Sequence, residues 1–157
     1  MVIYMKTASQ GISFMLRAVE AVIKPQTAYA HCDIPCGIYE TDTMQHAADT
    51  VIKMVEKMLE LKHPGEDNQK HLEFENTIAR MVHTKEEHAQ KCKEQILILW
   101  TDYFKDEHLA KHHDLHAKVW KAAKLCSAAK RSVDMNVAKQ LKDSVTEIAR
   151  IFAETKK

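Results

Sequence analysis

Apolar side chains recur at every third or fourth residue along most of the chain beyond residue 41. On an α-helix this spacing places them on one face, where they can be buried. The pattern predicts four helices: residues 41–62, a second helix from the turn at 63–67 to about residue 102, residues 113–130, and a fourth after a link at 132–136. Four amphipathic helices with short connections predict an all-α fold, an antiparallel four-helix bundle.

These helices are expected to bury the apolar positions of the pattern. They are Met44, Ala47, Ala48, Val51, Met54, Val55, Met58 and Leu61 in the first helix, Leu72, Ile78, Met81, Val82, Ala89, Cys92, Ile96, Leu99 and Trp100 in the second, Leu115, Val119, Ala122, Ala123 and Cys126 in the third, and Val137, Leu141, Val145, Ile148, Ile151 and Phe152 in the fourth. Cys92 and Cys126 belong to this set, because a free cysteine within a helical pattern usually packs as a small core residue.

Helix-breaking residues are rare. The chain contains three Gly and three Pro, and none of them lies beyond residue 65. This scarcity argues against turn-rich β architectures and glycine-rich phosphate loops. The segment Thr84–Glu87 has the form of a capping box and raises the alternative of a break in the second helix. We expect one continuous helix there, since no Gly or Pro accompanies it.

Length and charge exclude some classes of function and partner. A chain of 157 residues is sufficient for one domain with a single core. Its formal net charge is +1 and it has no basic block, so nucleic acid is not an expected partner. No apolar run approaches the length of a membrane span, so no membrane association is expected.

Residues 1–30 differ from the helical body. The apolar run at 11–16 is followed by Arg17, Glu20 and Lys24, which interrupt it before it can serve as a secretory signal. The segment ends in Ala28-Tyr29-Ala30, a small-x-small sequence that a peptidase can accept. The alternative is an ordinary amphipathic helix that ends at Pro25, and the sequence alone favours neither.

The residues that carry chemistry are concentrated at 31–39, a segment we call the hook. It contains His31, Cys32 and Cys36, and thiolate and imidazole groups on a short segment suit a square-planar ion such as Ni(II) or Cu(II). Pro35 fixes one backbone dihedral and Gly37 permits an unusual one, so the segment can curl around one point. A Cys32–Cys36 disulfide is the alternative.

The hook sequence HCDIPCGIY resembles the mature N-terminus of nickel superoxide dismutase. Further similar segments lie at 100–105 (WTDYFK), 114–116 (DLH), 127–130 (SAAK) and 151–157 (IFAETKK), so that the resemblance covers essentially all of residues 31–157. It implies a domain at 31–157, preceded by a leader at 1–30 that a processing peptidase removes between Ala30 and His31. It also implies one nickel ion per subunit and a homohexamer.

The resemblance also assigns roles in the hook. His31 would supply its freed α-amine and its imidazole, Cys32 its thiolate and deprotonated amide nitrogen, and Cys36 a second thiolate. Two anionic sulfurs and an anionic amide stabilise Ni(III), so a Ni(III)/Ni(II) cycle would convert superoxide to dioxygen and hydrogen peroxide. A peptide-bonded His31 nitrogen is a poor ligand, and this scheme therefore requires the cleavage.

Other positions have smaller roles by resemblance. Tyr39 would line the access route to the nickel or simply order the turn, and Tyr103 would be a second aromatic near the site or a core residue. Asp33 is expected to hold the loop through side-chain-to-backbone hydrogen bonds. Family members hold the histidine ligand with an outer Glu and Arg, but alignment without gaps puts Ala47 and His88 at these positions. That support is either absent or rebuilt in this chain.

Several other patterns have competing interpretations. His108, His112 and His116 recur every fourth residue and would form a stripe that binds zinc or copper if the third helix began early, but no carboxylate or Cys completes it. Glu60 and His63 have the Glu-x-x-His spacing of di-iron bundles, yet no second pair occurs. Lysines at 105, 111, 118, 121 and 124 either steer an anion or form a solvated face.

The alternative function is a non-enzymatic helical protein that binds or delivers nickel or copper through the hook. A structural bundle with an incidental cysteine pair is a third class. Free thiolates favour a reducing compartment, hence the bacterial cytoplasm, and the Ala-Tyr-Ala ending keeps export as an alternative.

Overall fold

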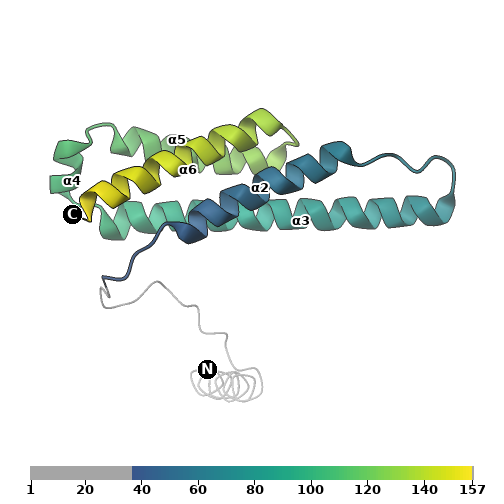
Figure 1. The fold of residues 1–157 in the computed structure, drawn as a ribbon, viewed down its shortest axis with the longest axis horizontal. Helices are drawn as coiled ribbons and strands as arrows, with labels where there is room; N and C mark the ends of the chain where they lie inside the picture. The colour runs from purple at the N-terminus through teal and green to yellow at the C-terminus, as the bar shows by residue number, and fades with distance from the viewer. Residues whose placement is uncertain (1–36, 157) are drawn as a thin grey trace, which may run out of the picture. The chain divides into compact units, whose positions relative to one another are not determined.

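A computed structural model describes residues 37–156, which belong to one compact unit of the chain. Its four long helices are α2 (Asp42–Glu60), α3 (Asn68–Ile98), α5 (Leu115–Arg131) and α6 (Met135–Thr155). Successive long helices run in opposite directions; α2 and α5 each pack against α3 and α6 (Figure 1). A turn of π-helix, η1 (Leu99–Tyr103), ends α3, and a short helix, α4 (Asp106–Lys111), precedes α5. The predicted all-α, antiparallel bundle is confirmed.

The core forms where the apolar faces of the four long helices meet. It contains Met44, Ala47, Ala48, Val51, Val55, Ala89, Cys92, Ile96, Leu99, Phe104, Leu115, Val119, Ala122, Cys126, Ala129, Ala138, Leu141, Val145, Ile148, Ile151 and Phe152. Most of the positions predicted for α2, α5 and α6 are in this set. The three-to-four residue spacing therefore identified the buried faces of these helices correctly.

The prediction of the buried face was wrong for the first half of α3. Leu72 is 53% exposed, and Ile78, Met81 and Val82 are only half-buried. The helix has 31 residues, against 17 in α5 and 21 in α6. Its first half extends beyond the ends of α5 and α6, alongside α2 (Figure 1). These side chains therefore lack the second layer that would bury them.

The second half of α3 buries a charged residue instead. Lys85 is 2% exposed and shares the repeating pattern of Ala89, Cys92 and Ile96. Its ammonium donates to the carbonyl oxygens of Ala129, Lys130 and Ser132 at the C-terminal end of α5. The last carbonyls of a helix have no intrahelical partner, so the lysine caps α5 from a neighbouring helix.

The helix boundaries follow local signals. Asp67 caps α3 by accepting from the Lys70 amide at 3.1 Å, and Asp134 caps α6 by accepting from the Asn136 amide at 2.7 Å. α3 runs through Thr84–Glu87 without a break, as predicted. The third predicted helix corresponds to α5, whereas α4 was not predicted. Among the described residues no helix has the length and apolar character needed to cross a membrane.

Candidate metal centre

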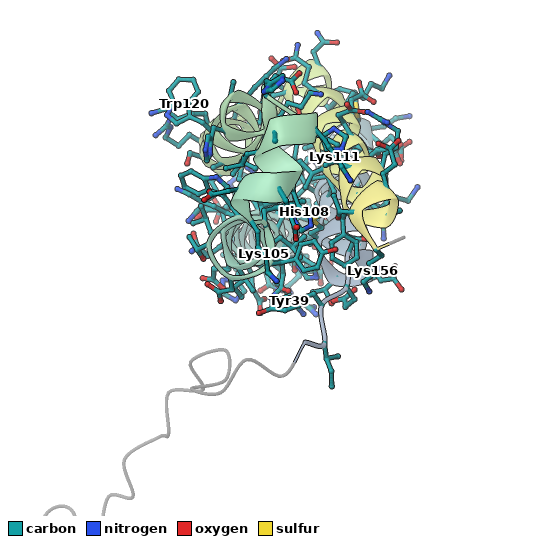
Figure 2. All side chains as sticks on the ribbon, turned by 90° about the vertical axis from the view of Figure 1, so that its left-hand side faces the viewer. Tyr39, Lys105, His108, Lys111, Trp120 and Lys156 are labelled. Carbon is teal, nitrogen blue, oxygen red and sulfur yellow. The ribbon has the colours of Figure 1, made fainter. Side chains whose placement is uncertain are left out.

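One end of the bundle brings together four segments that are far apart in the sequence. The chain enters α2 there, α3 ends there in η1, α4 crosses it, and α6 ends there (Figures 1 and 2). Between them lies a cavity of about 400 Å³, which we call the end cavity. Its lining consists of Gly37, Tyr39, Asp102, Tyr103, Lys105, Glu107, His108 and Thr155.

The final residues of the hook are held at this cavity by backbone and aromatic contacts. Gly37 has φ +69°, a backbone conformation that glycine adopts readily and other residues do not. The Tyr39 ring lies 5.4 Å from the ring of Tyr103, measured between centroids. Lys156 donates from Nζ to the Tyr39 carbonyl oxygen at 2.8 Å. The C-terminal end of α6 therefore helps to fix the segment that follows the hook.

Tyr103 lies between the core and the cavity. The π-turn inserts an extra residue before the helix ends, and the Phe104 amide donates to the Leu99 carbonyl at 3.0 Å. One side of the Tyr103 ring packs on Phe152 at 4.6 Å. Its other neighbours include His108, whose ring is nearly parallel to it at 5.5 Å. Tyr103 therefore belongs both to the edge of the core and to the wall of the end cavity.

Charged groups of both signs surround the end cavity. Lys105 and Lys156 are exposed on this end of the molecule, next to His108 and Tyr39 (Figure 2). Asp102 and Glu107 contribute carboxylates to the lining. An anion that enters the cavity therefore meets cationic side chains at its rim.

Comparison with known proteins decides the family. The model of the family described as nickel-containing superoxide dismutase matches residues 26–156. The chain belongs to this family. It is 35% identical over 128 residues to the superoxide dismutase [Ni] of Streptomyces seoulensis, covering 82% of this chain and 89% of that protein. For the superoxide dismutase [Ni] of Streptomyces coelicolor the identity is 37% over 131 residues, covering 83% and 92%.

Solved structures of nickel superoxide dismutase have the same fold. The native structure superposes with a TM-score of 0.70 at 35% identity, covering 81% of this chain and 100% of that chain. A structure with nickel ligation of the oxidised state gives a TM-score of 0.69 at 35% identity, covering 80% and 98%. The helical bundle of this chain is thus the bundle of the nickel superoxide dismutase family.

The predicted nickel ligands of this family member lie outside the described residues. These are His31, Cys32 and Cys36, together with Asp33 and the predicted cleavage site at Ala30 and His31. Within residues 37–156 no group of three or more His, Cys, Asp or Glu side chains is arranged to hold a metal ion. Tyr39 and Tyr103, the two predicted site residues that are described, lie together at the end cavity.

The two positions that depart from the family pattern line a second cavity, of about 260 Å³. Ala47 is buried at its wall, and His46, His88 and Lys91 are close by. His88 Nδ1 lies 2.9 Å from the Thr84 carbonyl oxygen. Because a carbonyl only accepts, Nδ1 carries the hydrogen, and in the neutral ring Nε2 is the acceptor nitrogen. The His46 ring is 6.4 Å away. Two imidazoles therefore stand near the positions where the Glu and Arg were expected.

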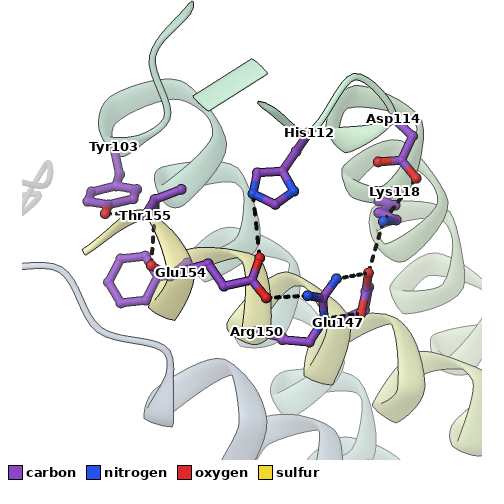
Figure 3. Close-up of polar contacts among 9 residues, drawn as sticks. Tyr103, His112, Asp114, Lys118, Glu147, Arg150, Glu154 and Thr155 are labelled. Atoms are coloured by element: carbon purple, nitrogen blue, oxygen red, sulfur yellow. Dashed lines mark hydrogen bonds and ion pairs between the residues drawn. The ribbon is translucent and has the colours of Figure 1, made fainter. Parts of the chain in front are cut away.

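The histidine stripe does not exist as one surface. α4 ends at Lys111 and α5 begins at Leu115, so the three histidines are not on one continuous helix. His112 Nε2 lies 3.7 Å from Glu154 on α6 (Figure 3). His116 Nδ1 accepts from the Trp100 indole at 2.8 Å. The Glu-x-x-His pair is also divided, because α2 ends at Glu60 and His63 lies in the turn.

Cys92 and Cys126 are free, fully buried core residues, as predicted. They interact across the contact between α3 and α5. The hydrogen bond with Cys126, together with burial, raises the pKa of Cys92 well above its usual range. The same bond lowers the pKa of Cys126, against the effect of burial. With no exposed surface, these two thiols have no open path to an incoming metal ion.

An ion-pair network stabilises the packing of α5 on α6 close to the end cavity. Glu147 accepts from Arg150 and from Lys118, each at 2.9 Å or less, and Lys118 also pairs with Asp114 (Figure 3). These contacts, with Arg150 first and Lys118 second, lower the pKa of Glu147 to about 2. Arg150 also bonds Glu154. The sequence suggested that the lysines of this region either steer an anion or form a solvated face. Lys118 instead forms ion pairs with Asp114 and Glu147.

Proposed function

We propose that this protein catalyses the dismutation of superoxide to dioxygen and hydrogen peroxide, with nickel bound by the hook. The supporting observation is that the family match spans residues 26–156, including a segment with His31, Cys32 and Cys36. Nickel held there would supply a one-electron Ni(III)/Ni(II) couple. Thiolate and imidazole donors fit this use, because anionic sulfurs favour the higher oxidation state of a late first-row ion.

Cleavage before His31 is part of this proposal. A free α-amine at His31 would add a nitrogen donor that a peptide bond does not offer. The lengths of the relatives support a division into leader and mature domain. The match to the native solved structure covers 100% of that chain but only 81% of this chain. Residues 1–30 would then be a leader that a processing peptidase removes.

The described residues act on the substrate before it reaches the metal. Tyr39 follows Cys36 by three residues, so the end cavity lies within a few residues' reach of the second thiolate. Lys105 and Lys156 attract the anion to this end of the bundle. Tyr39 and Tyr103 form an aromatic wall that limits what enters, and Asp33 would order the loop between the two cysteines.

Intact mass, metal content and turnover, measured on one purified preparation, test the function. We expect a chain that begins at His31, one nickel per subunit, and consumption of superoxide measured by stopped-flow absorbance. Cys32→Ser and Cys36→Ser should each abolish both nickel retention and turnover, whereas Cys126→Ala, a core control, should retain both. An active preparation that begins at Met1, or that contains iron, manganese or no metal, contradicts the proposal.

The carrier alternative makes a different prediction on the same sample. A delivery protein would bind nickel or copper that exchanges with a chelator and would not consume superoxide. The Tyr39–Tyr103 wall and the lysines beside it favour the enzyme, because a site that only gives up its metal has no need of an entrance for an anion. If the protein is only a structural bundle, Cys32→Ser and Cys36→Ser should change neither its metal content nor its activity.

Assembly and location are also proposals. We propose a homohexamer, because nine hook residues cannot shield a metal alone and large apolar side chains such as Leu59, Leu72 and Trp120 are more than half exposed. Analytical ultracentrifugation measures the assembly, and a monomer at micromolar concentration would contradict it. Free thiolates favour the bacterial cytoplasm, which cell fractionation tests against export.

A further inference from the structure

The direction of one O–H bond in the end cavity can be deduced from a chain of hydrogen bonds. Thr155 Oγ1 donates to the Phe152 carbonyl oxygen at 2.8 Å, and the Tyr103 hydroxyl lies 2.9 Å from Thr155 Oγ1 (Figure 3). A threonine hydroxyl has one hydrogen. Because Thr155 gives it to the carbonyl, Thr155 can only accept from Tyr103. The phenol hydrogen therefore points at α6, and the phenol oxygen offers other partners only lone pairs.

A neighbouring imidazole has the opposite character. His108 Nδ1 accepts from the Lys105 backbone amide at 3.2 Å, so the neutral ring carries its hydrogen on Nε2. Nε2 lies 3.8 Å from the nearest carboxylate oxygen of Glu107, which is too far for a hydrogen bond. The His108 ring stacks on Tyr103. The lining therefore contains, on two stacked rings, a donor nitrogen and a phenol oxygen that does not donate.

We propose that Thr155 is a positioning residue: it holds the O–H bond of Tyr103 toward α6, so that this hydrogen is engaged and an entering anion is bound by His108 Nε2–H and Lys105. The identity of the anion, superoxide, rests on the proposed function. An anion needs hydrogen-bond donors, whereas hydrogen peroxide and water can also donate to a lone pair. Tyr103 thus favours the protonated product and does not add to the affinity for anions.

This arrangement also constrains proton transfer. Reduction of superoxide to hydrogen peroxide takes up two protons. While the bond to Thr155 is in place, the hydrogen of Tyr103 is engaged and is not available to an occupant of the cavity. Tyr103 therefore orients the occupant without serving as its immediate proton donor.

Azide is a suitable probe anion, measured on the nickel-loaded full protein by infrared titration of its asymmetric stretch. Thr155→Val keeps the shape of the side chain and removes the acceptor, which frees the phenol hydrogen to turn into the cavity. We expect azide to bind about tenfold more tightly, equivalent to about 1.4 kcal/mol, with a shifted stretching band. Thr155→Ser keeps the hydroxyl and is the matched control, with azide affinity within about twofold of the parent.

Tyr103→Phe provides a second test that does not depend on the fold of the valine variant. If Tyr103 does not donate to the anion, removal of its hydroxyl should leave azide affinity unchanged, and Tyr103→Phe should cancel the gain in Thr155→Val. A several-fold loss in Tyr103→Phe alone, or no tightening in a folded Thr155→Val, overturns the proposal. Azide binding requires no turnover, so a lack of superoxide consumption in the native protein would count against the proposed function alone.

Discussion

Replacement of Lys85 by methionine tests whether a buried ammonium stabilises the bundle. The side chain is 2% exposed, and its Nζ lies 2.9 Å from the Lys130 carbonyl and 2.8 Å from the Ser132 carbonyl, with the Ala129 carbonyl also bound. Methionine keeps the length and apolar stem of the side chain. It removes the charge and all three donor hydrogens, so the experiment isolates the capping interaction.

Two opposing contributions decide how much Lys85→Met changes the free energy of unfolding. Burial lowers the pKa of Lys85, and the nearby Glu86 carboxylate partly offsets this effect. The lowered pKa reflects the cost of removing an ammonium group from water. Methionine avoids that cost but leaves carbonyl oxygens unpaired, each costing about 1–3 kcal/mol where water cannot replace the lysine. Ala129 is buried, whereas Lys130 and Ser132 are half-buried and can be hydrated. We therefore expect a net loss of about 2–4 kcal/mol in the free energy of unfolding.

Urea unfolding followed by circular dichroism measures this loss. Protein concentration and nickel loading must be equal for all variants, because subunit assembly and bound metal both shift apparent stability. Lys91→Met, an exposed position on the same helix, is the matched control and should change stability by less than about 0.5 kcal/mol. A Lys85→Met protein as stable as its parent would refute the reasoning, since the carbonyls of α5 would then need no cap.

Three further predictions concern charge and thiols. The pKa of Glu147 is about 2 in the folded protein, below its ordinary 4.5 because of Arg150 and then Lys118; its stabilisation is complete above about pH 4.5 and is lost as pH falls toward 2. Glu147→Gln should therefore destabilise by less than about 1 kcal/mol at neutral pH, as for a partly exposed pair, and the difference in thermal unfolding should vanish in acid. Lys105→Glu should lower kcat/KM for superoxide several-fold, more at low ionic strength, while Lys139→Glu at the other end of α6 should not; equal effects in stopped-flow assays would exclude local steering. Cys92→Ala should retain nickel in metal analysis and lose about 1–2 kcal/mol of stability, from a small buried group; loss of nickel would contradict its assignment to the core.

The fold could be predicted because helix periodicity and burial coincide wherever a helix is covered on one face. In α6 all of Leu141, Val145, Ile148 and Ile151 are buried as the spacing indicates. The same spacing failed at Leu72 and Ile78, since periodicity records which side of a helix is apolar but not how far the neighbouring helices extend. Lys85 was missed for a related reason: it occupies an apolar position in the repeat, and only the end of α5, 44 residues later in the chain, explains its charge.

The candidate site also contains residues that the sequence predicted and residues that it did not. Family resemblance gave Tyr39 as a residue of the access route or of the turn, and left Tyr103 open between the site and the core. Their contact follows from the meeting of η1 and the segment before α2 at one end of the bundle. Thr155 and His108 were not predicted as cavity residues, because a single Thr looks ordinary in sequence and the spacing of His108 from His112 and His116 suggested a metal-binding stripe instead. The π-turn at Leu99–Tyr103 that aims Tyr103 leaves no composition signature either.

The long hairpin of α2 and α3 separates the tip of the molecule from its chemistry. At about 1.5 Å per residue, residues 68–98 extend about 45 Å, so the turn at 63–67 is far from Tyr103. Insertions, deletions or a fluorophore attached at Glu66 should therefore leave the anion affinity of the end cavity in the same subunit unchanged. The tip is the natural place to anchor the protein to an electrode or a bead while it works.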